Sequence, residues 1–149
     1  MVDNISQRFE LLFDKNNNIA YKTLQILQKE SEETNSVYFY MDRLSDMLES
    51  YNSYIRTRGL TLIAYNAKWD SDYKIDEIID KYLKHIADSS SITARKCIIL
   101  LPIITKSKPE LRECIISALE KADISNYTDS MQPLVYRDIQ NSLVEIHRQ

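Results

Sequence analysis

Four basic side chains recur at one position of a repeated sequence pattern. The pattern fills ten-residue segments that begin at residues 18, 54, 91 and 133, and its second position is always Ile or Leu. The fifth position holds Lys22, Arg58, Arg95 and Arg137, with Arg56 and Lys96 adding charge nearby. Such a row could bind carboxylates or phosphates of a partner. Alternatively, each basic residue pairs with an acidic residue in a turn of its own or the next repeat.

Aromatic side chains are the second group with binding potential. The chain has 10 Tyr, 3 Phe and 1 Trp, and those between residues 38 and 73 are Tyr38, Phe39, Tyr40, Tyr51, Tyr54, Tyr65, Trp69 and Tyr73. Tyr and Trp are favoured anchors of interfaces because they combine a large rigid area with a polar tip. We therefore take Tyr40, Tyr54 and Trp69 as candidate partner-binding residues. The alternative is that they pack half-buried between helices, with Trp69 sealing the edge of the core.

Other catalytic and metal-binding patterns are missing from the sequence. One Gly in 149 residues excludes glycine-rich phosphate-binding loops. The two histidines, His85 and His147, do not have zinc-ligand spacing. The acidic pairs of the sequence are Glu32–Glu33, Asp70/Asp72 and Asp76–Glu77. Adjacent residues on a helix point in different directions, so these pairs do not form a catalytic dyad and are expected to face solvent. We expect no catalytic residue, no metal and no cofactor.

These side chains are expected to be carried by helices. Apolar residues recur every three or four positions in stripes such as Val2–Phe13, Val37–Tyr51, Ile75–Ile86 and Leu111–Ala122, and each stripe indicates one buried helix face. Start signals are expected at Asn16–Asn18, Ser36, Asp72, Ser89–Ser91 and a Ser107–Glu110 capping box. The sequence predicts eight helices, at about 3–14, 18–31, 36–51, 53–67, 73–87, 91–106, 109–122 and 131–147, with a kink at Pro102.

The bulk composition favours one soluble domain. Hydrophobic residues make up 44% and charged residues 28%, and the net charge is −3. The longest apolar run is far short of the ~20 residues of a membrane helix. No secretory leader is recognised at residues 1–10, so we expect a cytoplasmic protein without membrane contact. Cys97 and Cys114 both lie among Ile and Leu and are expected to be buried, reduced thiols.

Each apolar stripe is followed by one basic-marked segment, so the predicted unit is a pair of helices repeated four times. This arrangement resembles HEAT-like and armadillo-type repeats, with units at about 1–35, 36–70, 71–107 and 108–149. An Asp precedes the basic residue in three units (Asp14, Asp88 and Asp129), and the second unit departs from this pattern with Glu49 and Ser50 instead. The single glycine, Gly59, stands where such helices usually keep a small residue for close packing. A plain irregular helical bundle is the alternative.

The resemblance implies an all-α fold, a right-handed α-α superhelix of about four HEAT-like helix pairs. It also implies a non-enzymatic scaffold that binds a protein or peptide on its concave, second-helix surface. The alternative is a module that binds nucleic acid or a phosphate ligand through the basic row. A more remote alternative is a HEAT-like DNA glycosylase that uses Trp69, Asp70 and Arg58. An apolar end unit would imply a homodimer.

Overall fold

The computed structural model describes residues 4–149, which form eight α-helices and no strand. Val2 of the first stripe and the expected helix start at residue 3 lie outside these residues. The α-helices are α1 (Ile5–Glu10), α2 (Asn17–Glu33), α3 (Met41–Met47), α4 (Ser53–Tyr65), α5 (Lys74–Leu83), α6 (Ser91–Ser107), α7 (Arg112–Glu120) and α8 (Gln132–Arg148). Short 3-10 turns extend them at Leu11–Phe13, Tyr38–Tyr40, Ala67–Trp69, Lys84–Ala87 and Pro109–Leu111. The all-α prediction and its eight helices are confirmed.

Polar side chains at the helix starts explain several of these boundaries. Asn16 accepts hydrogen bonds from the backbone N–H groups of Asn18 and Ile19, and Ser90 accepts one from Thr93. Each bond satisfies a donor that has no partner inside the helix. These two predicted caps are confirmed, and Asn4 and Asn52 cap α1 and α4 in the same way.

Three other predicted start signals are wrong. Ser107 is the last residue of α6, and no side chain caps the 3-10 turn that follows at Pro109. Ser36 makes no cap either, because the turn at Tyr38 begins without a side-chain bond. At α5 the helix start is capped by Asp70 and not by Asp72. The Asp70 carboxylate accepts from the N–H groups of Lys74 and Ile75, at 2.9 Å each.

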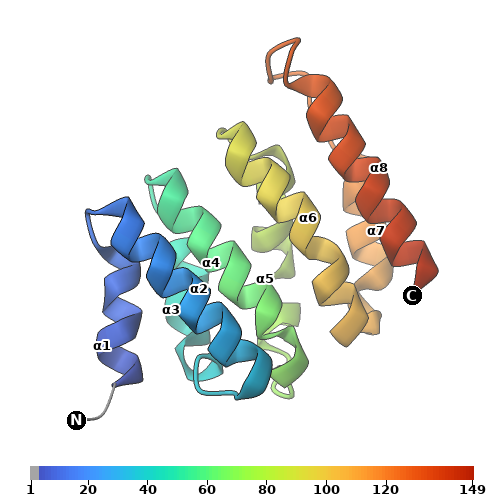
Figure 1. Cartoon of the computed structure of the whole chain (residues 1–149). Helices are drawn as coiled ribbons and strands as arrows, with labels where there is room; N and C mark the ends of the chain where they lie inside the picture. Colours follow the sequence, from blue (N-terminus) through green and yellow to red (C-terminus); the bar gives the residue numbers. More distant parts are fainter. Residues whose placement is uncertain (1–3) are drawn as a thin grey trace.

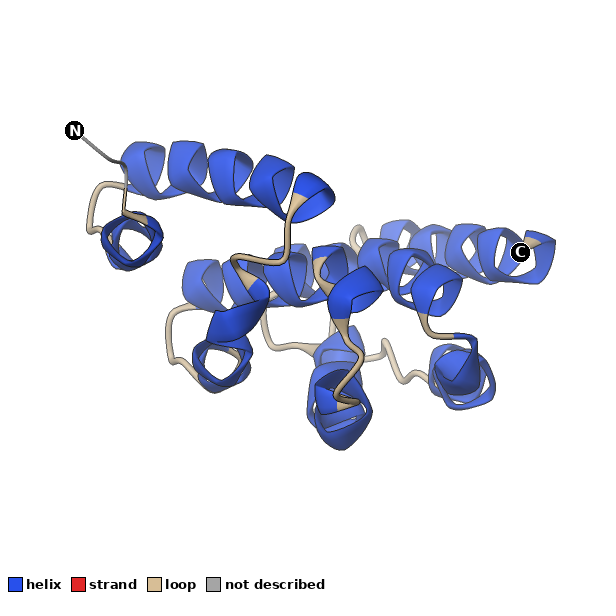
Figure 2. Ribbon diagram, turned by 90° about the horizontal axis from the view of Figure 1, so that it is seen from below, coloured by secondary structure: helices blue, strands red, loops and turns tan. Residues whose placement is uncertain are grey.

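The helices are arranged as consecutive pairs. The second helices of the pairs, α2, α4, α6 and α8, lie side by side, and α1, α3, α5 and α7 lie behind them (Figure 1). We call these two sets the second-helix layer and the first-helix layer. Seen from below, α2 stands higher than α4 and α6 (Figure 2). Within residues 4–149, no helix has the length and apolar character needed to cross a membrane.

The hydrophobic core lies between the two layers, and α4 is its central helix. Every residue of α4 from Arg58 to Ala64 is buried. Gly59 allows α4 to approach α3 closely, since a Cβ atom there would lie 2.9 Å from Met47 Cβ and 3.1 Å from the carbonyl oxygen of Leu44. Close packing at the single glycine is therefore confirmed.

Pro102 lies inside α6, and the helix continues through it to Ser107. Proline has no N–H, so the carbonyl of Ile98, four residues earlier, loses its helical partner. The hydroxyl of Ser142 in α8 donates to this carbonyl at 2.7 Å. The carbonyl that lacks a partner inside α6 therefore accepts a hydrogen bond from the adjacent helix α8.

Candidate functional site

The structure places the four residues of the basic row in different environments. Arg58 is only 5% exposed, and its guanidinium donates to the carbonyl oxygen of Leu12 at 2.8 Å and to Asn17 Oδ1 at 3.2 Å. Burial lowers the pKa of this guanidinium. Arg58 therefore fixes the second pair of helices to the first and has little surface to offer a partner.

Arg95 is half-buried and forms an ion pair with a carboxylate of the last helix. Its Nε lies 2.6 Å from Asp138 Oδ2. Lys22 and Arg137 are exposed and make no ion pair within residues 4–149. The prediction that each basic residue pairs with an acidic turn residue is therefore wrong, because the one pair that forms links two second helices, α6 and α8. The row is not a continuous set of exposed charges.

One of the acidic turn residues does form an ion pair, but with a different arginine. Asp88 binds Arg56 Nη2 at 2.7 Å and His85 Nδ1 at 2.6 Å, and all three side chains are largely buried. Burial alone would raise the pKa of Asp88, but the bonds from His85, Arg56 and the Ser90 N–H hold this pKa well below its ordinary value. This cluster joins the second pair of helices to the third.

The candidate aromatic residues also differ in accessibility. Tyr40 is half-buried and stacks on Phe9, with 4.6 Å between the ring centroids. Trp69 is half-buried against the core, and its indole N–H donates to the carbonyl of Ser31 at 2.7 Å. Tyr54 is 59% exposed. Of the three consecutive aromatics at 38–40, Phe39 is 78% exposed.

The two layers carry opposite excesses of charge. The four second helices contain nine Lys and Arg against five Asp and Glu. The four first helices contain five Lys and Arg against eight Asp and Glu. Helices α4 and α6 have no acidic residue. The molecule as a whole has a net charge of −3, so this separation is hidden in the bulk composition.

A groove of about 480 Å³ opens on the second-helix layer between α2 and α6. We call it the α2–α6 groove, and its lining residues are Tyr21, Leu24, Gln25, Gln28, Lys29, Glu32 and Lys96. Leu24 is buried beneath it, while Tyr21 is 58% exposed. Lys96 was expected as charge beside the basic row, whereas the groove residues of α2 carry no sequence signal of a site, because the groove depends on how two helices far apart in the chain pack.

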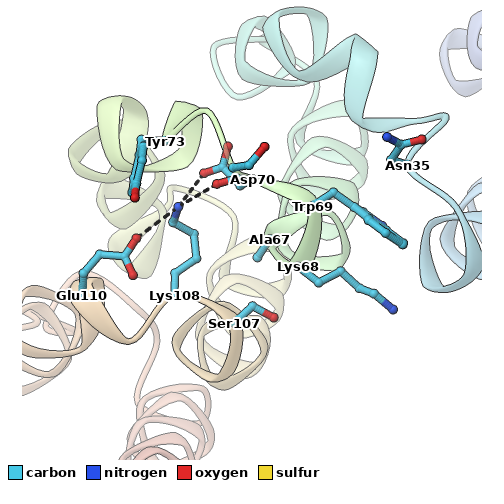
Figure 3. Close-up of a pocket in the computed structure, with 10 residues that line it drawn as sticks. Asn35, Ala67, Lys68, Trp69, Asp70, Tyr73, Ser107, Lys108 and Glu110 are labelled. Atoms are coloured by element: carbon cyan, nitrogen blue, oxygen red, sulfur yellow. Dashed lines mark hydrogen bonds and ion pairs between the residues drawn. The ribbon is translucent and has the colours of Figure 1, made fainter.

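A second cavity, of about 630 Å³, lies where the C-terminal ends of α2, α4 and α6 meet. Its most polar feature is a buried lysine, Lys108, which is 3% exposed. Lys108 points toward Asp70 and Glu110, while Trp69 points away from it (Figure 3). The Lys108 ammonium lies 2.8 Å from Asp70, 2.6 Å from Asp76 and 3.2 Å from Glu110. Its hydrogen bonds go to Asp70, at 2.8 Å from Oδ2 and 3.3 Å from the backbone carbonyl.

The protonation of this cluster follows from its contacts. Burial alone would raise the pKa of Asp70, but the bonds from Lys108, Tyr38 and two backbone N–H groups lower it. Burial would lower the pKa of Lys108, and its carboxylate partners raise it instead. Tyr38 donates to Asp70 Oδ1 at 2.7 Å, and both its burial and this carboxylate raise its pKa. Around neutral pH, Lys108 is charged and Asp70 is ionised.

Tyr73, beside this cavity, has an unusual backbone conformation. Its φ of 59° and ψ of 30° are in the left-handed region, which is rare for a bulky residue and costs on the order of 1–3 kcal/mol. The turn allows Asp70 to reach back to the start of α5 and brings the Tyr73 ring 4.9 Å from the Lys108 ammonium. The left-handed conformation of Tyr73 thus helps to place both Asp70 and the Tyr73 ring beside Lys108.

Two predictions from the sequence are wrong, one about the exposure of the acidic pairs and one about the burial of the cysteines. Asp70 does not face solvent; it is 6% exposed and binds Lys108, as does the half-buried Asp76. Lys108 was missed because the sequence around it reads as a capping box. Cys97 is buried as expected, but Cys114 is exposed.

The trio Trp69, Asp70 and Arg58 is not brought together around one cleft. Asp70 binds Lys108, whereas Arg58 lies in α4 and binds the turn between α1 and α2. Within residues 4–149, no group of His, Cys, Asp or Glu side chains is placed to hold a metal ion.

Comparison with known proteins gives no match: no family model, no curated protein and no solved structure is similar to this chain.

Proposed function

We propose that the chain is a helical-repeat scaffold that holds a segment of another protein on its second-helix layer. In this proposal the four helix pairs are HEAT-like repeats and form a right-handed α-α superhelix. The order of contacts supports it, since α4 packs against α2 and α6, and α6 packs against α8. Such nearest-neighbour stacking is the physical basis of repeat proteins. We assign the protein no catalytic step.

The observation that carries the proposal is the α2–α6 groove. It combines an exposed aromatic ring with amide and ammonium groups, and its volume of about 480 Å³ is within the ~300–1,000 Å³ of typical binding pockets. The cavity at Lys108 is larger, but Lys108 already binds three carboxylates of the same chain. The groove therefore offers the better site for an external partner.

Nucleic-acid binding along the basic row is the weaker candidate. Arg58 is buried and Arg95 is paired with Asp138, so within residues 4–149 only Lys22 and Arg137 of the row are exposed without a carboxylate partner. Tight nucleic-acid binding relies on many phosphate contacts. The excess of basic residues in the second-helix layer is the observation that favours this candidate.

A peptide-display selection with matched variants tests the proposal. Random 12-residue peptides are selected on the wild-type protein and then measured against Tyr21→Ala/Gln28→Ala, which removes groove contacts without changing charge. The control is Tyr51→Ala/Gln7→Ala, two exposed positions outside the groove. We expect the selected peptides to lose at least tenfold in affinity only with the groove variant. Peptides that bind all three proteins equally would contradict the proposal.

A further inference from the structure

The charges of the α2–α6 groove indicate the sign of its occupant. Lys29 and Lys96 line the groove and make no ion pair within residues 4–149, against one acidic lining residue, Glu32. The neighbouring helices α4 and α6 contain no acidic side chain. Carboxylates placed in the groove would meet these two ammonium groups with little like-charge repulsion. Complementarity of this kind speeds association and selects partners.

The amide groups of the groove indicate the conformation of its occupant. Gln25 and Gln28 each offer a carbonyl acceptor and an NH₂ donor, and neither side chain is bonded to another described residue. An extended segment carries backbone N–H and C=O groups that need partners, whereas a helix has already satisfied its own. The two glutamines therefore match an extended backbone better than a helix.

The groove also offers apolar surface. Tyr21 is 58% exposed at its rim and Leu24 is 7% exposed at its base. Covering the Tyr21 ring with an apolar side chain removes exposed aromatic surface from water, which is the usual source of affinity at the centre of an interface.

We propose that the occupant of the α2–α6 groove is an extended, acidic segment of another protein that carries an apolar side chain. This inference rests on the proposed function and specifies the chemistry of the bound segment. Acidic residues of the segment meet Lys29 and Lys96, its backbone meets Gln25 and Gln28, and its apolar side chain covers Tyr21.

The test uses the groove-dependent peptides of the display selection and a charge-reversal variant, Lys29→Glu/Lys96→Glu. The matched control is Lys84→Glu/Lys121→Glu, which changes the net charge equally at two exposed lysines outside the groove. Each peptide is measured by fluorescence anisotropy in its selected form and with every Asp and Glu replaced by Asn and Gln. A labelled 12-nucleotide single-stranded DNA is measured in parallel, across 50–200 mM salt.

We expect the groove-dependent peptides to be rich in Asp and Glu. The groove reversal, and separately the amide-substituted peptide, should each weaken binding at least tenfold, while the control stays within twofold of wild type. Groove-dependent peptides that are neutral or basic and insensitive to the reversal would overturn the inference and leave the proposed function standing. DNA binding with a steep salt dependence that is lost in the reversal, without any groove-dependent peptide, would overturn both.

Discussion

At the scale of single residues, the structure is tied together by buried charges that come from different helix pairs. Lys108 follows α6 and binds Asp70, which follows α4, and Asp76, which belongs to α5. Asp88 joins Arg56 and His85 in a second such cluster. A buried charge is costly unless it is paired. Removing one member of either cluster would leave a buried charge without its partner, so these residues are expected to be sensitive to substitution.

Replacing Lys108 with Met should be strongly destabilising. The substitution keeps the side-chain length but leaves the buried Asp70 carboxylate without its ammonium partner. Loss of one member of a buried ion pair typically costs about 3–5 kcal/mol, so we expect that decrease in the free energy of unfolding measured with urea at pH 7. Lys121→Met, at an exposed lysine, is the control and should change it by about 0.5 kcal/mol or less. Equal effects of the two substitutions would contradict the role of Lys108.

Stability should fall at acid pH because of the same clusters. The pKa values of Asp70 and Asp88 are lowered in the folded state, so the stability they contribute is present above the unfolded value of about 3.9. This stability is lost as the pH falls through the lower pKa values that the two carboxyl groups have in the folded state. Urea midpoints between pH 6 and pH 2 should show this decline, and Asp88→Asn should show a shallower one. An identical pH profile for the variant would contradict the role of Asp88.

At the scale of helices, apolar periodicity was enough to locate all eight elements. The caps at Asn16 and Ser90 stand directly before their helices and were predictable for that reason. The cap of α5 was not, because Asp70 lies four residues before the helix and reaches it only through the left-handed turn at Tyr73. A turn of that kind leaves no periodic signal in the sequence.

Gly59→Ala should destabilise the protein although alanine is the better helix former. Helix propensity favours the substitution by roughly 1 kcal/mol. The new Cβ would lie 2.9 Å from Met47 Cβ and 3.1 Å from a backbone oxygen of α3, and the backbone cannot move away cheaply. Overpacking typically costs ~1–3 kcal/mol, so we expect a net loss of up to about 2 kcal/mol in urea unfolding. A gain in stability would show that α3 and α4 are not in close contact at Gly59.

Ser142→Ala should weaken the contact between α6 and α8. The Ile98 carbonyl, which Pro102 leaves without a helical partner, would become a buried acceptor with no donor. An unsatisfied buried group costs about 1–3 kcal/mol. The double variant Pro102→Ala/Ser142→Ala restores the helical N–H, so it should lose less stability than Ser142→Ala alone when both are measured by thermal unfolding. Equal losses would contradict this coupling.

At the scale of the whole molecule, the charge separation between the two layers is the feature that the sequence suggested least. The basic row was visible in the sequence, but its members diverge in the structure because Arg58 points into the contact with the first pair of helices. The α2–α6 groove depends on the spacing of two helices whose segments lie far apart in the chain. Local patterns locate helices, whereas the surface that helices form together depends on their packing.

The most direct test of the proposed binding face is NMR mapping of a groove-dependent peptide on the full chain. Backbone amide shifts are recorded as the peptide is added to the ¹⁵N-labelled protein. We expect the largest shifts to cluster at Tyr21, Gln25, Gln28 and Lys96, on α2 and α6, and those of α3, α5 and α7 to stay unchanged. Largest shifts on the first-helix layer, or around Lys108, would contradict it.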